Sequence, residues 1–419
     1  MTTDFQKESL SFAQKCFDDV RAMSKDTTGV SRQGYGPVET KVLEYFKKIG
    51  EELKLEISTD KAGNVWMTVP GKNRNLPALV SGSHADSVPQ GGNYDGLAGI
   101  VAALTVARWM RETGYQPERD YTVLMMRMEE SSWFGKCYVG SLGMTGQLTE
   151  KDLALKHRSN GKTLAETIKE CGFNPDDLTT GKPVVDLSKM AAFIELHIEQ
   201  GPILDKEQID IGVVTGVQGI SWQEFTLRGV SNHAGTTPMS MRRDAGLAAA
   251  KIAVFARELA LSLGGNQVAT VGHFSVKPNL INVIPNHVVM SVDLRNTDNA
   301  ILCLAEQQLA EFVAKTSQEE GVEITSRSLV RFNPVIFADE IVNAVEAEAE
   351  RQALSYRRLP SGAGHDAQFM ASVCPAGMIF VPCVDGISHN VKEHSAAKDL
   401  IAGANVLLQV VLQRAQRMD

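Results

Sequence analysis

The feature that most constrains the fold is a buried apolar strand that runs directly into a turn of polar and glycine residues. The strand is LPALV (residues 76–80), and the turn is SGSHADSVPQGGNYDG (residues 81–96). An apolar helical pattern follows from Gly96 to Thr113, and a second apolar run, YTVLMMRM (residues 121–128), comes after it. A buried strand, a helix and a further buried strand in this order are typical of a parallel sheet covered by helices on both faces.

The same alternation returns later in the chain. AAFIELHI (residues 191–198) and AGMIFVPCV (residues 376–384) predict two more strands, and a closing helix is predicted from Ser395 to Met418. Between them the pattern changes to that of a small α+β layer. Its predicted strands are SWQEFTLRGV, QVATVGHFSV, HVVMSVDLRN and VEITSRSLV, and its predicted helices are Asp244 to Leu261 and Ala300 to Glu320.

These patterns predict an α/β fold with two domains. The larger is a discontinuous, mainly parallel-sheet domain formed by residues 1–215 and 331–419. The smaller is an inserted α+β domain of ferredoxin-like character at residues 216–330, with two helices on one face of its sheet.

Composition excludes several classes of protein. The chain has 419 residues and a net charge of −8, with no basic block, which argues against a nucleic-acid partner. Its longest apolar stretch, residues 97–107, is too short to cross a bilayer, and the N-terminus lacks the pattern of a signal peptide. Six cysteines without CxxC spacing are usual for reduced thiols. We therefore expect a cytoplasmic protein without a membrane partner.

The turn after residues 76–80 carries three candidate functional side chains. His84, Asp86 and Asp95 lie just beyond the carboxyl end of a predicted parallel strand, where open α/β sheets bind their ligands. His84 and Asp86 are two residues apart, so on extended backbone they share a face, and Asp86 can orient the imidazole while it binds a metal. The alternative is a structural loop with an Asp cap before the helix.

A pair of adjacent carboxylates ends the next strand. Glu129 and Glu130 follow an apolar run directly, and burying two like charges is costly unless a cation neutralises them. A metal could take one carboxylate and leave the other as a general base. The alternative places both carboxylates in solvent at the strand end.

Two histidines follow the remaining strands. His197 alternates with apolar residues near the end of one strand, and His389 lies in the loop GISHNVKEHS after the other, with His394 as a competing candidate. A lone histidine in either place is more often structural. Together, however, the four segments bring imidazoles and carboxylates to the ends of separate strands of one sheet, and this mixture suits zinc, manganese, cobalt or nickel.

In order along the chain, these segments resemble a family of M20-type metallohydrolases. The family includes N-carbamoyl-L-amino acid hydrolases, allantoate amidohydrolases and β-ureidopropionases. The matching motifs are SGSHADSVPQGGNYDG, MEES with a following GS, ELHIEQGPILD, SNHAGTTPM with RRDA, INVIP, DLRN, SGAGHDA, and GMIFVP with GISH. The series covers nearly the whole chain and is far more specific for the fold and the metal chemistry than for the substrate.

The resemblance implies two divalent metal ions per subunit, with zinc favoured and manganese, cobalt or nickel as alternatives. The implied ligands are His84, Asp95, Glu130, His197 and His389, with Asp95 bridging the two ions. It further implies that Glu129 moves the proton of the attacking water, that Asp86 orients His84, and that His233 in the inserted domain stabilises the oxyanion. The inserted domain is implied to be a lid through which a homodimer forms.

The resemblance also implies the substrate-binding residues. Asn282 and Arg295 match family positions, and a guanidinium is suited to a bidentate grip on a carboxylate. Gln200 can donate to and accept from a ureido group, and Gly364 can let backbone N–H groups approach the substrate, with the neighbouring His365 and Asp366 bracing that loop.

The expected reaction is hydrolysis of an N-carbamoyl-L-amino acid to the amino acid, carbon dioxide and ammonia. Allantoate or β-ureidopropionate hydrolysis is the nearest alternative, an N-acyl-amino acid or dipeptide hydrolase is a weaker one, and a catalytically silent metabolite-binding protein is remote. The chain departs from the family at SSWF (residues 131–134), where Gly-Ser-Arg-Phe is usual, and at Cys383, where Ser is common. These departures leave the ligands intact and bear on which substrate side chain is accepted.

Overall fold

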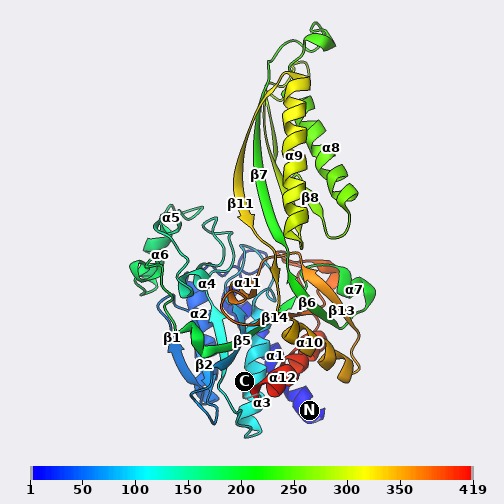
Figure 1. Cartoon of the computed structure of the whole chain (residues 1–419). Coiled ribbons are helices and arrows are strands. Elements are labelled where there is room, and N and C mark those ends of the chain that lie inside the picture. Colours follow the sequence, from blue (N-terminus) through cyan, green and yellow to red (C-terminus); the bar gives the residue numbers. More distant parts are fainter. Residues whose placement is uncertain (1–2, 417–419) are drawn as a thin grey trace. The chain divides into compact units, whose positions relative to one another are not determined.

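The larger sheet is built from the predicted apolar runs. The computed structural model describes residues 3–416, and its nine-stranded sheet has the order β1-β2-β4-β3-β5-β14-β6-β12, with β13 paired to β6 (Figure 1). The strands are β1 (Glu56–Thr59), β2 (Val65–Val69), β3 (Ala78–His84), β4 (Tyr121–Met126), β5 (Met190–Ile198), β6 (Ile211–Val217), β12 (Val335–Ile336), β13 (Tyr356–Ser361) and β14 (Ala376–Val381). Strand β3 is parallel to β4 and β5, and β14 is parallel to β5, whereas β2 is antiparallel to β4 and β6 is antiparallel to β14. The carboxyl ends of the four central strands therefore lie at one edge.

Helices cover both faces of this sheet, as the sequence predicts. They are α1 (Thr3–Ser24), α2 (Pro37–Glu52), α3 (Leu97–Glu112), α4 (Val139–Met144), α5 (Glu150–Leu153), α6 (Leu164–Glu170), α7 (Ile203–Glu207), α10 (Asp339–Arg351), α11 (Asp366–Met370) and α12 (Ala397–Ala415), with short 3₁₀ turns at Pro175–Leu178, Leu187–Lys189 and Val384–Gly386. On β5, the Leu196 side chain lies close to the backbone of Gly403 in α12, while Glu195 accepts from the Ala367 N–H in α11. Because successive strand residues point to opposite faces, α11 and α12 lie on opposite sides.

Two predicted helices have informative ends. Helix α3 begins after Gly96, whose φ of +67° is in the left-handed region, and a Cβ there would lie 2.5 Å from the His84 ring. Glycine is thus needed both for the turn and for the space next to the histidine. Helix α12 ends at Ala415 among the described residues, and the predicted end at Met418 lies outside them.

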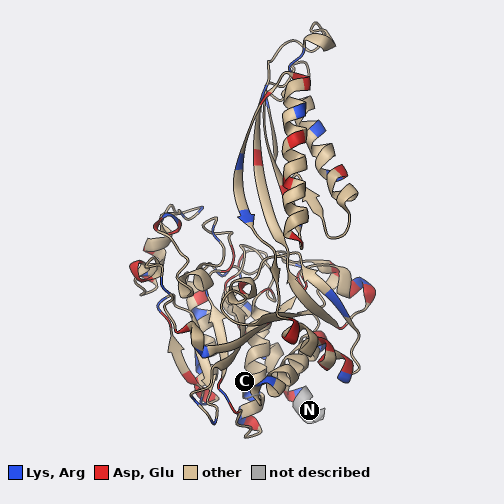
Figure 2. Cartoon of the chain, viewed as in Figure 1, with Lys and Arg blue, Asp and Glu red and all other residues tan. Residues whose placement is uncertain are grey.

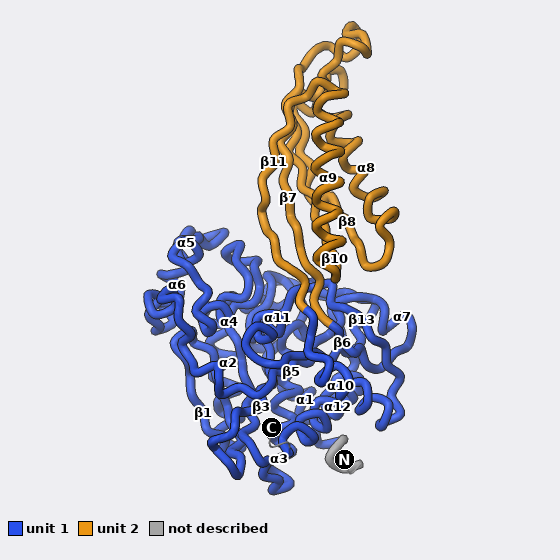
Figure 3. Tube along the Cα trace, in the orientation of Figure 1, with its two compact units in different colours: residues 1–215, 336–419 blue, residues 216–335 orange. Residues whose placement is uncertain are grey.

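The chain divides into two compact units. Unit 1 consists of residues 1–215 and 336–419, and unit 2 consists of residues 216–335 (Figure 3). The second junction lies beyond the expected residue 330 because β11 continues to Phe332. Each unit has its own hydrophobic interior.

Unit 2 is a five-stranded antiparallel sheet of order β11-β7-β10-β8, with β9 also paired to β10. Its elements are β7 (Gly219–Arg228), η3 (Met239–Met241), α8 (Ala245–Leu263), β8 (Val268–Thr270), β9 (Phe274–Lys277), β10 (His287–Asn296), α9 (Asn299–Glu320) and β11 (Glu323–Phe332). The run QVATVGHFSV, predicted as one strand, is two. It breaks at residues 271–273, where the His273 N–H donates to the Ser291 hydroxyl while the His273 carbonyl accepts the Ser291 N–H.

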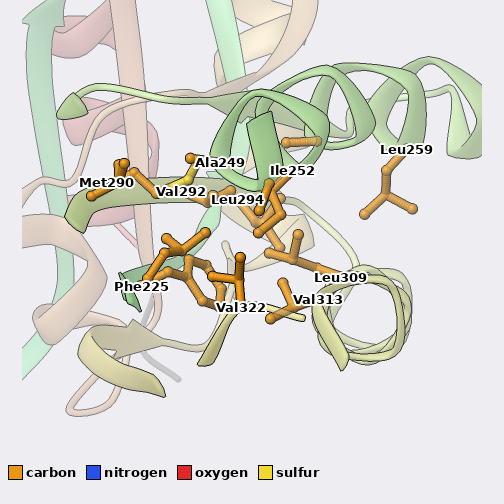
Figure 4. Packing of buried hydrophobic residues seen from close by; sticks show 14 of the residues in the cluster. Phe225, Ala249, Ile252, Leu259, Met290, Val292, Leu294, Leu309, Val313 and Val322 are labelled. Atoms are coloured by element: carbon orange, nitrogen blue, oxygen red, sulfur yellow. The ribbon is translucent and has the colours of Figure 1, made fainter. Parts of the chain in front are cut away.

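The core of unit 2 lies between its sheet and two helices. Alternate β10 residues are fully buried, namely Val288, Met290, Val292 and Leu294, and they pack with apolar residues of α8 and α9 (Figure 4). This alternation is expected for a sheet with one covered face, so both predicted helices lie on the same side.

Basic and acidic segments are interspersed in both units (Figure 2). Among the described helices, none combines the length and apolar character that a membrane crossing requires.

Candidate metal centre and active site

The central strands of unit 1 bring the predicted ligands to one place. His84 ends β3, Glu130 follows β4, and His197 is near the end of β5, while His389 follows β14. These four strands are neighbours in the order β4-β3-β5-β14, so their carboxyl ends converge. Asp95 enters from the turn before α3.

Asp95 stands between two groups of side chains. Its Oδ1 lies 3.4 Å from His84 Nε2 and 3.2 Å from His197 Nε2. Its Oδ2 lies 3.0 Å from His389 Nε2, which is itself 3.1 Å from Glu130 Oε1. Each carboxylate oxygen therefore faces its own pair of potential ligands.

These groups fit a pair of divalent ions. Two donors on one tetrahedral ion, each at about 2.0–2.1 Å, are about 3.3 Å apart, which matches the separations around Asp95. Two candidate groups contain Asp95: one is His84, Asp95 and His197, and the other is Asp95, Glu130 and His389. A third candidate group, Glu195, His197 and His365, does not contain Asp95 and shares His197 with the first. Imidazole and carboxylate donors of this kind suit zinc and its first-row neighbours.

The electrostatics of the site also favour bound cations. Burial lowers the pKa of His84, but hydrogen bonding to Asp86 and Asp95 outweighs burial and holds the pKa well above its usual value. Hydrogen bonds to Asp95 and Glu130 raise the pKa of His389 to about 11. Burial alone would raise the pKa of Asp95, yet the three histidines hold it well below its usual range. The carboxylates thus attract positive charge to the positions a metal would take.

Asp86 connects the first two strands of the site. Its Oδ1 lies 3.2 Å from His84 Nδ1, as an orienting role requires. It also accepts the Glu129 N–H at 2.9 Å and the Glu130 N–H at 3.1 Å, one at each oxygen. The carboxylate therefore fixes the backbone of the paired glutamates, a function that the sequence did not indicate.

Glu129 is placed differently from Glu130. Among the described residues it belongs to none of the three candidate metal groups. It is only 8% exposed. Burial raises the pKa of Glu129 well above its usual value, and the charge of Glu130 adds to this effect. A carboxylate beside a cationic pair with a raised pKa is suited to accept and return a proton.

A buried ion pair supports the backbone before Glu129. Met128 has a φ of +47°, an unfavourable value for its side chain. Its N–H donates to Glu39 Oε1 at 3.0 Å, and the other Glu39 oxygen accepts from Arg127 at 2.7 Å. Glu39 and Arg127 are both buried, so they hold the strained turn that presents the glutamates.

Gln200 lies directly beside the Asp95 carboxylate. Its Nε2 donates to Asp95 Oδ2 at 2.9 Å and reaches the Ser388 hydroxyl at 3.3 Å. Gln200 and His389 both have left-handed backbones, with φ of 57° and 54°. Conformations of this kind often mark functional sites.

The loop after β13 is braced as expected. His365 Nε2 is 2.8 Å from the Ser361 hydroxyl, and Asp366 accepts from the Ser141 hydroxyl at 2.6 Å. A Cβ at Gly364 would lie 1.7 Å from the Tyr138 hydroxyl. Glycine is thus required at this position by the close approach of the tyrosine.

Other candidates near the motifs serve the structure. The ring of His394 contacts the Tyr94 hydroxyl at 3.2 Å, and among the described residues it belongs to neither candidate group around Asp95. Glu199 lies beyond the end of β5 and caps α7 through the N–H groups of Ile203 and Leu204. It does not join His197 at the centre.

Sequence reasoning missed two residues beneath the centre. Arg32 is fully buried and donates to the Ala85 carbonyl at 2.8 Å and to Asn93 at 3.1 Å, so it supports the turn that carries Asp86 and Asp95. Glu393 is 3% exposed and contacts the same turn. Glu393 could have been suspected as a charge four residues after His389, whereas no local pattern distinguishes Arg32.

Trp133, which belongs to the SSWF departure from the family motif, connects two segments of unit 1. Its indole N–H donates to the Ser87 carbonyl at 2.9 Å, directly after Asp86. Its ring stacks on His157, with centroids 5.8 Å apart and planes 18° apart. The tryptophan thus holds the segment around His157 to the turn of the metal centre.

The remaining predicted residues belong to unit 2. His233 pairs with Val283 in an antiparallel bridge, and the Ala234 N–H donates to the Asn282 carbonyl at 2.9 Å, so the loops bring His233 and Asn282 together. His233 Nδ1 accepts the Gly235 N–H at 3.0 Å. The ring proton is therefore assigned to Nε2, which is left as a donor.

Arg295 lies elsewhere in unit 2. In the register of β10 and β7, Arg295 is opposite Ile220, at the start of β7, whereas the His233 loop follows the end of that strand. The guanidinium is paired with Asp293, whose Oδ2 accepts from Nη2 at 2.9 Å. The structure therefore does not bring Arg295 to His233 within one unit.

Comparison with known proteins agrees with this geometry. The model of peptidase family M20/M25/M40 matches residues 80–413. The chain belongs to this family. Among its M20 relatives, an N-carbamoyl-L-amino-acid amidohydrolase of Rhizobium meliloti is 35% identical over 408 residues, covering 96% of this chain and 97% of the relative.

Two further proteins show the same likeness. An allantoate amidohydrolase of Escherichia coli (strain K12) is 35% identical over 387 residues, covering 92% of this chain and 93% of the relative. A solved structure of an amidase of the hydantoinase/carbamoylase family from Burkholderia multivorans superposes with a TM-score of 0.88 at 36% identity, covering 97% and 98% of the two chains. The M20 family consists of metal-dependent hydrolases, in agreement with the donor groups around Asp95.

Proposed function

We propose that the protein hydrolyses the carbamoyl C–N bond of N-carbamoyl-L-amino acids and that each chain binds two divalent ions, zinc foremost. The observation that supports the metal chemistry is that the two oxygens of the Asp95 carboxylate face different groups of potential ligands. The likeness to carbamoyl-amino-acid amidohydrolases over almost the whole chain supports the substrate class.

His84, Asp95 and His197 would hold one ion, and Asp95, Glu130 and His389 the other. When bound, two such ions polarise a carbonyl and make a water molecule more acidic. Glu129 takes the proton of the attacking water and returns it to the leaving nitrogen, a role that suits its burial and raised pKa. Asp86 keeps His84 and the backbone of both glutamates in place for this transfer.

The polar groups around the centre are assigned to the substrate. Gln200, next to Asp95, donates to and accepts from the ureido group, and the Gly364 backbone approaches the substrate where no side chain intervenes. Arg295 binds the substrate carboxylate, exchanging part of its contact with Asp293. Asn282 assists it, and His233 donates from Nε2 to the oxyanion.

The distances within unit 2 favour a site completed by two chains. Arg295 and His287 are eight residues apart on β10, so the ends of this strand are separated by roughly 27 Å. Pairing of Gly229 with Asn286 and of Asn232 with Ile284 carries the His233 loop further from the sheet. One small substrate cannot touch His233 and Arg295 of the same chain, so we infer that a second copy supplies one of them.

Unit 2 offers a surface for this second copy. Leu247, Val254 and Leu261 recur every seven residues on α8 and are 41%, 58% and 70% exposed. Val268 on the edge strand β8 is also 47% exposed. An apolar stripe next to an unpaired strand edge is suited to a twofold interface, so we propose a homodimer formed through unit 2.

A substrate panel tests the reaction. Purified protein loaded with zinc, manganese or cobalt should release ammonia from N-carbamoyl-L-amino acids, and a chelator should abolish the release. Allantoate, β-ureidopropionate and N-acetyl-L-amino acids are tested in parallel. Faster turnover of allantoate would replace the proposed substrate with that of the E. coli relative, and absence of turnover on every ureido compound would refute the proposal.

Mixing two inactive variants tests the shared site. His233→Ala and Glu129→Gln are each expected to be nearly inactive. If His233 acts on the partner's centre, a mixed dimer has one intact site, and random re-association should recover about a quarter of wild-type activity. If His233 acts on its own chain, this mixture recovers nothing, and Arg295 would have to come from the second copy. The same mixture made with Arg295→Ala in place of His233→Ala should then recover about a quarter of wild-type activity, and failure of both mixtures would contradict the two-chain arrangement.

A further inference from the structure

A single buried carboxylate connects the two loops that carry Asp95 and His389. Glu393 Oε1 accepts the N–H of Tyr94 at 2.8 Å and the N–H of Asp95 at 3.1 Å. Its Oε2 accepts the Ser388 hydroxyl at 3.0 Å and the His389 N–H at 3.3 Å. All four donors lie on or directly before the two proposed ligands, and the turn and the loop are almost 300 residues apart in sequence.

The surrounding backbone is shaped around this side chain. A Cβ at Gly92 would lie 2.2 Å from the Glu393 carboxylate carbon, so only glycine leaves room for it. His389 has a φ of 54°, an unfavourable value that the bond from its N–H to Glu393 helps to hold. Ser388 extends the connection, since its hydroxyl is also 3.3 Å from Asp95 Oδ2.

The two carboxylate oxygens act on different parts of the centre. The Oε1 side fixes the Asp95 turn, and Asp95 belongs to both ligand groups. The Oε2 side fixes the His389 loop, and His389 belongs to only one group. Loss of the Oε2 contacts should therefore disturb one ion, whereas loss of the whole side chain should disturb both.

We propose that Glu393 is a positioning residue that holds Asp95 and His389 at the spacing of a metal pair, and that its Oε2 side specifically maintains the ion bound by Asp95, Glu130 and His389. The inference rests on the proposed pair of ions. Glu393 itself is not a ligand, because its oxygens are directed at backbone N–H groups and the Ser388 hydroxyl.

Two variants separate the two sides of the carboxylate. In Glu393→Gln, the amide oxygen can still accept from Tyr94 and Asp95, and the amide nitrogen can face the Ser388 hydroxyl, but the His389 N–H loses its acceptor. We expect a 10–100-fold weaker affinity for one ion and an unchanged affinity for the other, because changes in residues that orient ligands typically have this size. In Glu393→Ala, both ions should bind more weakly.

The readout is metal binding, measured apart from turnover. Cobalt is titrated into metal-free protein and followed by its visible absorption, and competition with a chelator gives the two affinities. Urea unfolding of each metal-free variant shows that it is folded. Asp298→Asn is a matched control, because Asp298 accepts two backbone N–H groups at the start of α9, in unit 2, and among the described residues belongs to none of the candidate metal groups.

The outcomes distinguish a failure of the positioning role of Glu393 from a failure of the proposed pair of ions. Wild-type protein that binds fewer than two ions contradicts the proposed pair itself. If wild type and Asp298→Asn bind two ions, selective loss of one affinity in Glu393→Gln supports the positioning role. The positioning role would be overturned if Glu393→Ala bound both ions with wild-type affinity. It would also be overturned if Glu393→Gln lost affinity for both ions equally.

Discussion

The substitution Asp86→Asn changes one atom of the carboxylate that links His84 to the paired glutamates. Asp86 is fully buried, and each oxygen accepts one backbone N–H, from Glu129 at 2.9 Å and from Glu130 at 3.1 Å. An asparagine has only one acceptor oxygen, so its amide nitrogen must face one of these donors. The arrangement that retains the contact with His84 puts the nitrogen opposite the Glu130 N–H.

The expected loss of stability follows from the Glu130 N–H, which is left without an acceptor. A buried N–H without an acceptor costs about 1–3 kcal/mol, and this loss is expected in the unfolding free energy of the metal-free protein. Displacement of Glu130 and looser orientation of His84 should also weaken metal binding about 10–100-fold. The two effects are separable because one is measured without metal and the other with it.

Urea unfolding of the metal-free protein and chelator competition with the loaded protein measure both effects. Asp366→Asn is the matched comparison. Asp366 is also fully buried, but its Oδ2 has no hydrogen-bond partner, and burial raises its pKa to about 7. Removing that charge should leave stability unchanged or improve it. Equal stability losses in both variants, or wild-type metal affinity in Asp86→Asn, would refute the reasoning.

Three further substitutions test other parts of unit 1. Glu129→Gln should lower kcat at least 10²–10⁴-fold while both ions remain bound, as steady-state kinetics and metal analysis would show. Gly364→Ala puts a Cβ 1.7 Å from the Tyr138 hydroxyl and should cost about 1–3 kcal/mol in urea unfolding, with partial recovery when Tyr138→Phe is added. Burial raises the pKa of Glu39 from its ordinary 4.5 to about 7, so this group contributes stability at low pH that is lost as the pH rises through that range. At about pH 5 the Glu39 carboxyl is mostly protonated, and Glu39→Gln should be less stable than wild type because its amide nitrogen cannot accept from one of the two donors, Arg127 or the Met128 N–H. The difference should shrink towards about pH 8, as wild type loses the stability linked to protonation of Glu39; a constant difference would contradict the assignment.

Local sequence patterns predicted those elements whose apolar sequence pattern matches their burial in the structure. The strands β3, β4, β5 and β14 are mostly apolar and almost entirely buried, as parallel strands covered on both faces are. Polar residues that follow such strands therefore lie together at the carboxyl edge of the sheet. For this reason the convergence of His84, Glu130, His197 and His389 could be expected before the structure was known.

The features that sequence did not predict depend on contacts between distant segments. Nothing in the residues around Arg32 or Glu39 distinguishes them from surface charges, yet Arg32 and Glu39 are fully buried next to the centre. The division of QVATVGHFSV into two strands depends on the Ser291 hydroxyl, which lies on the neighbouring strand. Glu199 shared the alternation of His197, but the strand ends one residue earlier, and its side chain turns to the start of α7.

The ten-residue strand β7 spans the sheet of unit 2 between residue 219 and the loop that carries His233. Its side chains alternate between a covered and an open face, so inserting or deleting one residue would reverse the facing of everything that follows. Only an insertion or deletion of two residues keeps the side chains on their faces, and each such change moves the loop by about 6.8 Å. Such steps are much coarser than the tenths of an ångström that the proposed hydrogen bond from His233 to an oxyanion requires. Among descendants of this chain, fine adjustment of His233 must therefore come from residues 229–244, and indels should accumulate there while strand length stays constant.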